Sequence, residues 1–183
     1  MPAPAVGHKL LLEGRPGVGK TTLALRLAIL LRQAGVAVCG FVSEEIREHG
    51  GRVGFSVETL GGQRALLAHV NFPGPPQVGR YGVDLVAFER LVLPALQADP
   101  GACRVAIVDE LGRMELASQP FRDAMGQLFG SDLAVVATVH AFAHPFTDAL
   151  KARPDVETIA VTADSRDRLP GLLAARLTGR QVR

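Results

Sequence analysis

The sequence predicts an α/β fold with a doubly wound, mostly parallel sheet, and two observations lead to this prediction. Short apolar runs alternate with longer amphipathic segments along the 183 residues, a pattern that is typical of a parallel sheet covered by helices on both faces. Hydrophobic residues make up 48% of the chain and aromatic residues only 5%, so the core must be built from aliphatic side chains. The length fits a single domain over residues 1–183.

The first elements follow from the apolar pattern. The run at Leu10–Leu12 predicts a strand, and the apolar spacing over residues 23–31 predicts a helix that ends at Gly35. The segment Val36–Val42 is apolar almost throughout, as expected for a strand that is covered on both faces. Residues 43–70 contain two Gly pairs and alternating apolar residues, which indicates antiparallel hairpins instead of another crossover helix.

The later elements begin after a segment rich in Pro and Gly. Residues 71–82 predict a loop, which could lie over the ligand site described below. Asp84 is a candidate N-cap for a helix that runs to about Gln97, although Pro94 could kink it or end it early. We expect the remaining strands at 105–108, 133–139 and 158–161, and the remaining helices at 119–129, 146–152 and 164–177.

Residues 14–22, GRPGVGKTT, match the phosphate-binding pattern G-x-x-x-x-G-K-[ST] without a mismatch. Its three glycines can adopt backbone angles that are closed to other residues, so successive N–H groups can surround the β-phosphate of a nucleoside triphosphate. Lys20 is expected to reach the β- and γ-phosphates, and Thr21 to give its hydroxyl to Mg²⁺. An ordinary Gly-rich turn, the alternative, would need neither residue. The expected nucleotide-binding residues are Gly14, Arg15, Pro16, Gly17, Val18, Gly19, Lys20, Thr21 and Thr22.

A second part of the site is predicted where the strand at 105–108 ends in two acids. The sheet brings this carboxyl end beside the phosphate loop, so Asp109 is the candidate Mg²⁺ partner. Glu110 could accept a proton from an attacking water, although two acids at a strand end can also be only a solvated loop. Arg113 could stabilise charge on the transferring phosphoryl group, or it could be an exposed side chain paired with Glu115. The candidate catalytic residues are therefore Lys20, Glu110 and Arg113.

Other polar residues have weaker patterns. Thr138 could face the γ-phosphate or the attacking water, or it could be an ordinary β-branched strand residue. His140 and His144 lack a third metal ligand at a suitable spacing, so we interpret them as loop or surface histidines. Cys39 and Cys103 have no partner at metal-ligand spacing either, and we interpret them as buried thiols in a reducing cytosol.

Charge and hydropathy argue against several kinds of partner. The net charge is only +2 and the basic residues are scattered, whereas nucleic-acid binding would need a basic stripe. We see no signal peptide, and no apolar run exceeds five residues, so no membrane span is expected. We therefore expect a cytoplasmic protein that binds nucleoside triphosphates, without nucleic-acid or membrane partners. The oligomeric state is left open, with a monomer favoured.

Several segments, taken in order and spacing, cover nearly the whole chain. They are GRPGVGKTTL at 14–23, GFVSEEIR at 40–47, GRVGFSVETL at 51–60, RYGVDLVAFERLVLPAL at 80–96 and VAIVDELGRMEL at 105–116. Together they resemble the small P-loop nucleoside-triphosphatases first described from thermophiles. This series is far more specific than the phosphate loop alone.

The resemblance implies a RecA-like P-loop core and Mg²⁺-dependent hydrolysis of nucleoside 5′-triphosphates to diphosphate and phosphate, slow and with little base preference. The family's motif residues fall here on Lys20, Thr21, Asp109, Glu110 and Arg113. Arg166 matches an Arg that family members tend to have, which could contact the base or a phosphate. The family often has Lys in place of Arg113 and Pro in place of His140.

Two other functions use the same phosphate loop. A nucleotide or small-molecule kinase is one alternative, although we see no Arg-rich lid segment between the later strands. A nucleotide-dependent switch with negligible turnover alone is the other. GTP-specific switches usually read guanine with an [NT]-K-x-D loop, whereas residues 162–165 here read TADS, without the Lys. Hydrolysis is the leading hypothesis.

Overall fold

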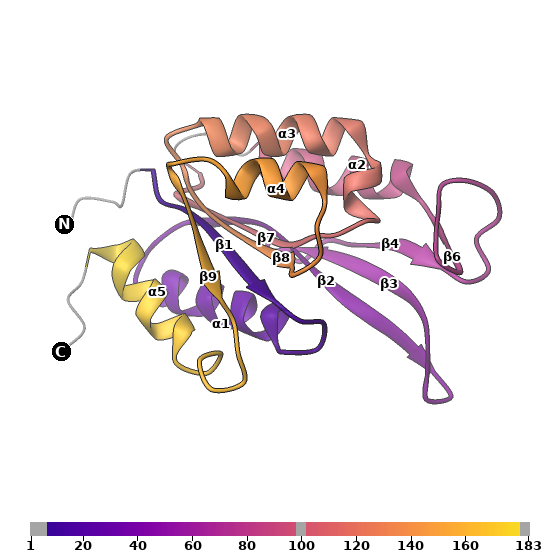
Figure 1. Ribbon diagram of the computed structural model, residues 1–183, viewed down its shortest axis with the longest axis horizontal. Helices are drawn as coiled ribbons and strands as arrows, with labels where there is room; N and C mark the ends of the chain where they lie inside the picture. The colour runs from indigo at the N-terminus through magenta and orange to yellow at the C-terminus, as the bar shows by residue number, and fades with distance from the viewer. Residues whose placement is uncertain (1–6, 98–101, 180–183) are drawn as a thin grey trace.

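The computed structural model describes residues 7–97 and 102–179, which form one sheet between two layers of helices (Figure 1). The strands are β1 (Lys9–Gly14), β2 (Val38–Glu48), β3 (Gly51–Thr59), β4 (Arg64–His69), β5 (Gln77–Val78), β6 (Tyr81–Val83), β7 (Val105–Leu111), β8 (Ala134–His140) and β9 (Val156–Ala160). The helices are α1 (Lys20–Gln33), α2 (Leu85–Leu96), the 3-10 turn η1 (Glu115–Ala117), α3 (Gln119–Gly130), α4 (Pro145–Lys151) and α5 (Leu169–Thr178).

The strand order is β5-β6-β4-β3-β2-β7-β8-β1-β9, and the two ends of the sheet are built differently. The five strands from β2 to β9 in this order run parallel. Beyond β2 the sheet continues with antiparallel pairs. This arrangement confirms the predicted mostly parallel α/β fold with an antiparallel hairpin insertion. It also places β8 between β1, which leads into the phosphate loop, and β7, which carries the acids.

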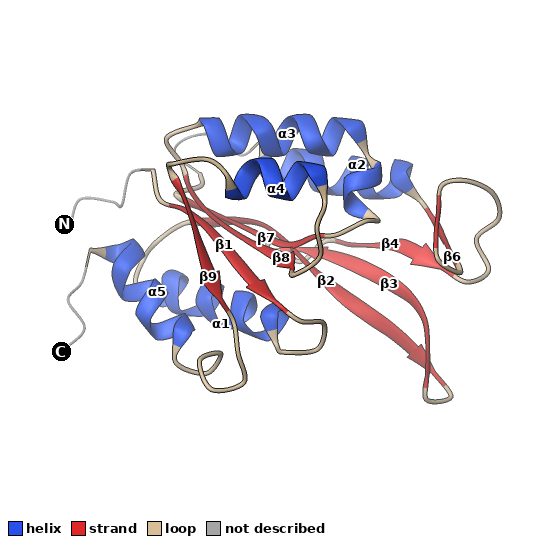
Figure 2. Cartoon of the chain, viewed as in Figure 1, coloured by secondary structure: helices blue, strands red, loops and turns tan. Residues whose placement is uncertain are grey.

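Helices cover both faces of the parallel strands (Figures 1 and 2). The helices α1 and α5 lie on one face, and α2, α3 and α4 lie on the other. Side chains along a strand point alternately to the two faces. Thus Leu10 and Leu12 are buried under α1 and α5, whereas Leu11 belongs to the core under the other three helices. In the part of the chain that the structure describes, no helix is long and apolar enough to cross a membrane.

The few aromatic residues are concentrated in one of these cores. Phe41 of β2, Phe88 of α2 and Phe121 of α3 are fully buried and pack edge to face, with ring centroids 5.1–5.9 Å apart. Edge-to-face packing of this kind adds about 0.5–1.5 kcal/mol for each pair beyond the burial of apolar area. This cluster packs α2 and α3 against β2 at Phe41, two residues before Ser43, which contacts Asp109.

Two local predictions differ from the structure, and a third is confirmed. Residues 71–82 include β5 and part of β6, which form the outer edge of the sheet, far from β1 and β7, so the suggestion that they cover the nucleotide is wrong. The helix α5 begins at Leu169 and not at Asp164, because Thr162 and Ser165 exchange hydrogen bonds of 3.0 and 3.2 Å in a turn. Asp84 caps α2 as predicted, accepting a 2.9 Å hydrogen bond from the N–H of Ala87.

The interpretation of the two cysteines as thiols is wrong. Cys39 and Cys103 form a disulfide, with an S–S distance of 2.05 Å and Cα atoms 5.5 Å apart. Cys39 lies on β2, and Cys103 lies two residues before β7, the neighbour of β2 in the sheet. Because the two residues are 64 positions apart, only the pairing of these strands reveals that they meet.

Candidate active site

The phosphate loop connects β1 to α1, and its glycines serve two different purposes. Gly17 and Gly19 have positive φ angles of 76° and 106°, in the left-handed region that favours glycine. Gly14 does not have a positive φ angle, so the expectation that all three glycines of the loop adopt such angles is corrected. A Cβ at Gly14 would lie 2.9 Å from Val18 Cγ1 and 3.0 Å from the Val161 carbonyl oxygen, so close packing requires this glycine. Across residues 7–97 and 102–179, no group accepts a hydrogen bond from the N–H of Gly17 or Gly19, which leaves both able to bind an anion.

Lys20 is the first residue of α1, and its side chain is folded back onto the phosphate loop. Its Nζ donates hydrogen bonds to the carbonyl oxygens of Gly14 at 2.8 Å and Arg15 at 3.1 Å. Burial lowers the pKa of Lys20, and the negative charges of Glu110 and Asp109 oppose this shift. A phosphate bound to the loop would therefore supply a direct counter-charge to an ammonium group that carbonyl oxygens now solvate.

Asp109 lies on β7 and is held by residues from three other elements. Its Oδ1 accepts a 2.6 Å hydrogen bond from Thr138 Oγ1 of β8, and its Oδ2 lies 3.4 Å from the N–H of Ser43 on β2. Burial raises the pKa of Asp109, and hydrogen bonds from the side chains of Thr138 and Thr21 oppose the shift. The side chains of Thr21, at the start of α1, and Asp109 therefore meet. Thr138 contacts Asp109, a partner that the sequence did not indicate.

A β-bulge places the two acids. The pairing of β7 with β8 shifts between Val108 and Leu111, so that Asp109 and Glu110 together lie opposite one residue of β8. In a regular strand, consecutive side chains point to opposite faces, whereas a bulge redirects one of them. The effect is visible in their contacts, because Asp109 reaches Thr138 while Glu110 reaches a residue two positions further along the same strand.

That residue is His140, whose Nε2 is in direct contact with Oε1 of Glu110. Since Thr138 and His140 are two positions apart on β8, their side chains point to the same side of the strand. Burial, followed by the positive charges of Lys20 and Arg113, lowers the pKa of His140 to about 4, so the imidazole is neutral at pH 7. The interpretation of His140 as a loop or surface residue is therefore wrong. His144 is a loop residue whose Nδ1 caps α4 through the N–H of Phe146 at 3.2 Å.

Glu110 and Glu115 form a pair of partly and fully buried carboxyl groups. A Cβ at Gly112 would lie 2.8 Å from Glu115 Oε2 and 3.1 Å from Glu110 Oε1, so both groups converge on this glycine. Burial, followed by the charge of Asp109, raises the pKa of Glu110 to about 7. Burial, followed by the charge of Glu110, raises the pKa of Glu115 to about 8. Within the described residues Glu115 forms no ion pair with Arg113, which is exposed, so that alternative for Arg113 is not observed.

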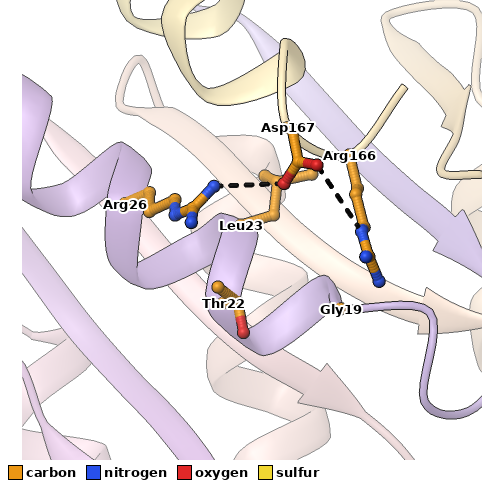
Figure 3. A pocket seen from close by; sticks show the side chains of 6 residues that line it. All are labelled: Gly19, Thr22, Leu23, Arg26, Arg166 and Asp167. Carbon is orange, nitrogen blue, oxygen red and sulfur yellow. Dashed lines mark hydrogen bonds and ion pairs between the residues drawn. The ribbon is translucent and has the colours of Figure 1, made fainter. Parts of the chain in front are cut away.

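A cavity of about 220 Å³ lies beside the phosphate loop, between α1 and the turn that precedes α5. Its lining residues are Gly19, Thr22, Leu23, Arg26, Arg166 and Asp167 (Figure 3). Arg166 Nη1 donates a 3.2 Å hydrogen bond to the carbonyl oxygen of Val18, which ties this side chain to the loop. Arg26 pairs with Asp167 at 3.1 Å across the cavity. Thr22 and Arg166, both expected at the nucleotide site, thus share one cavity.

Comparisons with known proteins agree with this geometry. A family profile described as NTPase matches residues 9–173. The chain belongs to the NTPase family. It is 41% identical to nucleoside-triphosphatase THEP1 of Thermotoga petrophila over 88% of each chain, and 38% identical to the human cancer-related nucleoside-triphosphatase over 90% of this chain and 93% of that one.

Solved structures support the same family and confirm the P-loop fold. The crystal structure of THEP1 from Aquifex aeolicus superposes with a TM-score of 0.83 at 32% identity, over 92% of this chain and 98% of that one. The solution structure of the human cancer-related nucleoside triphosphatase gives a TM-score of 0.81 at 34% identity, over 96% and 100% of the two chains. The predicted resemblance to this family of enzymes is therefore confirmed.

Proposed function

We propose that this member of the NTPase family hydrolyses nucleoside 5′-triphosphates to the diphosphate and phosphate with the help of Mg²⁺. The observation that carries the proposal is the position of Glu110, on the bulge beside Asp109, with its pKa raised by burial to about 7. A general base is most effective when its pKa lies near the working pH. The names of the relatives, as nucleoside-triphosphatases, support the same reaction.

The phosphates would bind to residues 14–22. The positive φ angles of Gly17 and Gly19 would allow their N–H groups to point toward a bound phosphate. The N-terminal end of α1 also favours negative charge. Lys20 would leave the carbonyl oxygens of Gly14 and Arg15 and contact the β- and γ-phosphates. The residues around these positions, Arg15, Pro16, Val18, Thr21 and Thr22, complete the proposed phosphate site.

The donor set at Asp109 fits Mg²⁺. Asp109 is 1% exposed, and its carboxylate lies within hydrogen-bond reach of the Thr21 side chain. Mg²⁺ prefers oxygen ligands and commonly takes only one or two from the protein, with the rest from phosphates and water. No cluster of three or more metal-binding side chains occurs among the described residues, so substrate oxygens would have to complete the coordination. When bound there, Mg²⁺ would neutralise charge that develops on the phosphates.

In the proposed reaction, Glu110 takes a proton from a water as the water oxygen forms a bond to the γ-phosphorus. The bond from this phosphorus to the bridging oxygen breaks, and the diphosphate leaves. Lys20 and Arg113 are the proposed cationic side chains at the transferring group. Arg113 is exposed and forms no ion pair within residues 7–97 and 102–179, so it is poorly fixed in place. Weak fixation of this kind supports the proposal of slow turnover.

The cavity beside Arg166 supports a weak preference among bases. Its volume of about 220 Å³ is smaller than typical ligand pockets of about 300–1,000 Å³, and Arg26, Arg166 and Asp167 are exposed on its walls. We propose that Arg166 contacts the base or a phosphate there. Initial rates with ATP, GTP, CTP and UTP should differ by no more than about tenfold in kcat/KM, or about 1.4 kcal/mol. A preference of several orders of magnitude for one base would contradict this proposal.

The proposed partners follow from the same site. We propose nucleoside triphosphates as the protein's ligands and a monomer as its state in solution. The small net charge of +2 supports the absence of nucleic-acid binding. A cytoplasmic location is proposed because nucleoside triphosphates are made and used there. Disulfides persist mainly in oxidising compartments, so the redox state of Cys39 and Cys103 in the cell tests this location.

Two substitutions at neighbouring positions test the proposed function. Glu110→Gln should bind Mg²⁺-ATP normally and hydrolyse it about 10²- to 10⁴-fold more slowly, because a positioned water loses its proton acceptor. Asp109→Asn should instead raise the Mg²⁺ requirement and weaken nucleotide binding as well as turnover. Phosphate release measures turnover and its Mg²⁺ requirement, and titration calorimetry measures binding. Formation of the nucleoside diphosphate without matching phosphate release, in the presence of a panel of acceptor monophosphates, would indicate a kinase. Near wild-type hydrolysis by Glu110→Gln would rule out Glu110 as the base.

A further inference from the structure

His140 has no role in the reaction proposed above, yet its side chain lies directly beside the proposed base, Glu110. It is the last residue of β8, and its Nε2 contacts Oε1 of Glu110 across the bulge. Both side chains are partly buried, with exposed fractions of 23% and 29%. The pair therefore lies at the mouth of the site, where Glu110 can meet solvent and His140 can restrict how the carboxylate turns.

The protonation of the pair follows from its surroundings. The imidazole is neutral, because burial and the charges of Lys20 and Arg113 lower its pKa. When Glu110 is ionised, as a base must be, the contact requires a proton on Nε2, which then donates to Oε1. The other ring nitrogen, Nδ1, is buried and has no hydrogen-bond partner within the part of the chain that is described.

A buried Nδ1 without a hydrogen-bond partner is not expected for a histidine whose role is only packing. A buried nitrogen without a partner costs about 1–3 kcal/mol, and most buried polar atoms avoid that cost. The Phe142 ring lies against the imidazole, with centroids 5.4 Å apart and an angle of 31° between the rings, and this contact limits rotation of the imidazole. The polar contact that His140 does make is with the carboxylate of Glu110.

We propose that His140 is a positioning residue for Glu110, holding Oε1 through its Nε2–H so that Oε2 faces the attacking water. The proposal rests on the proposed function, in which Glu110 is the base. A glutamate side chain has three rotatable bonds, and fixing one carboxylate oxygen removes most of the orientations in which the other oxygen misses the water. Orientation of this kind acts on the chemical step and leaves substrate binding unchanged.

Two variants separate the hydrogen bond from the bulk of the ring. His140→Ala should lower kcat for ATP hydrolysis by about tenfold with KM changed less than about twofold, because transition-state positioning alone is lost. His140→Gln, whose side-chain amide can donate to Oε1, should recover kcat to within about threefold of the wild type. The matched control is His144→Ala, at a histidine on the following loop whose Nδ1 caps α4; its kcat should equal that of the wild type.

The same substitution in a second background shows whether His140 acts through Glu110. In Glu110→Gln, His140→Ala should change the residual kcat by less than about twofold, since no basic carboxylate remains to be positioned. Far-ultraviolet circular dichroism and Tm check that each variant is folded. If His140→Ala does not fold, His140→Leu takes its place, because it fills similar volume without a donor.

The outcomes distinguish failure of this proposal from failure of the proposed function. An unchanged or increased kcat in His140→Ala, or an equal loss in both backgrounds, overturns the positioning role while Glu110 can still be the base. Absence of recovery in His140→Gln, in a folded protein, also overturns it. Wild-type hydrolysis by Glu110→Gln alone would instead remove the base assignment on which both depend.

Discussion

The two halves of the candidate site are held by different kinds of interaction. The phosphate loop is a continuous segment whose shape comes from its own glycines and from Lys20 bonded to its carbonyl oxygens. The acidic half is assembled from β2, β7 and β8, and Asp109 is held by Ser43 and Thr138. Local geometry therefore determines the first half, and the register of neighbouring strands determines the second.

This difference predicts how each half responds to change. A substitution in the phosphate loop should act directly on phosphate binding, because few other elements can compensate. A substitution in the acidic half should act through its neighbours, so that effects on the metal requirement, on stability and on rate appear together.

Within the phosphate loop, the largest effect is expected for Lys20→Ala. The change removes the only point charge proposed to span the β- and γ-phosphates, so kcat/KM should fall by at least about 10²- to 10³-fold. Triphosphate affinity should also weaken, measured by titration calorimetry with Mg²⁺-ATP. Undiminished turnover would place the active site elsewhere, whereas Lys20→Arg is expected to restore charge but not geometry.

Opening the disulfide should have the next largest effect, and on stability only. Cys39 and Cys103 close a loop across 64 positions, and a cross-link of this length contributes about 4 kcal/mol in the chain-entropy account, with about 2–4 kcal/mol typical of measurements. Reductant should therefore lower the midpoint of chemical unfolding. The Cys39→Ala/Cys103→Ala double variant is the control, since its midpoint should not respond to reductant. An identical midpoint with and without reductant in the wild type would mean that the cysteines are thiols in solution.

A smaller effect is expected from Thr138→Val, which removes the 2.6 Å hydrogen bond to Asp109 and keeps the shape. Leaving a buried acceptor without its donor costs about 1–3 kcal/mol. Stability should fall by this amount in the absence of nucleotide, and the Mg²⁺ concentration for half-maximal rate should rise. Thr138→Ser keeps the hydroxyl and should behave like the wild type. An unchanged Mg²⁺ requirement in Thr138→Val would separate Thr138 from the proposed metal site.

The same contrast explains what could be predicted from the sequence. The phosphate loop, the alternation of strands and helices, and the Asp84 cap depend on nearby residues, and each is confirmed. The position of β7 beside β8 depends on contacts made at a distance. The start of α5 was missed for a local reason, because the turn between Thr162 and Ser165 was not recognised. The predicted strand at 105–108 ends before Asp109, whereas β7 continues to Leu111 through a bulge. No local sequence pattern indicated this bulge.

The residues that sequence reasoning missed are those that meet only through the sheet. Cys39 and Cys103 had no visible partner because neither the order nor the register of β2 and β7 was known. His140 stood two residues after Thr138, at the spacing that puts both side chains on one side of a strand. That spacing indicated that His140 and Thr138 face the same side. It could not show that His140 contacts Glu110, because that contact depends on the bulge in β7. Glu115 lay within a segment that carried the family resemblance, but nothing in the sequence showed that it was buried.

The last expected effect concerns Glu115 and appears only as a dependence of stability on pH. Burial raises its folded-state pKa from 4.5 to about 8, so the folded protein holds a proton that the unfolded chain releases. A group with a raised acid pKa destabilises the fold progressively as the pH rises from about 4.5 to about 8, and it has no such effect below the unfolded value. Glu115→Gln keeps the size of the side chain and cannot ionise, so this pH-dependent loss of stability should disappear.

Thermal unfolding of the nucleotide-free protein at two pH values measures that change. At pH 5 the Tm of Glu115→Gln should be equal to or below that of the wild type, because both side chains are then neutral. At pH 8 it should exceed the wild-type value, because a shift in pKa from 4.5 to about 8 corresponds to several kcal/mol, and each kcal/mol shifts Tm by about 2–4 °C in a chain of this length. Glu48→Gln, at the exposed end of β2, is the matched control and should shift Tm equally at both pH values. If Glu115→Gln also shifts Tm equally at both, Glu115 is ionised in the folded state, and Glu110 then lies beside a permanent negative charge and not beside a neutral acid.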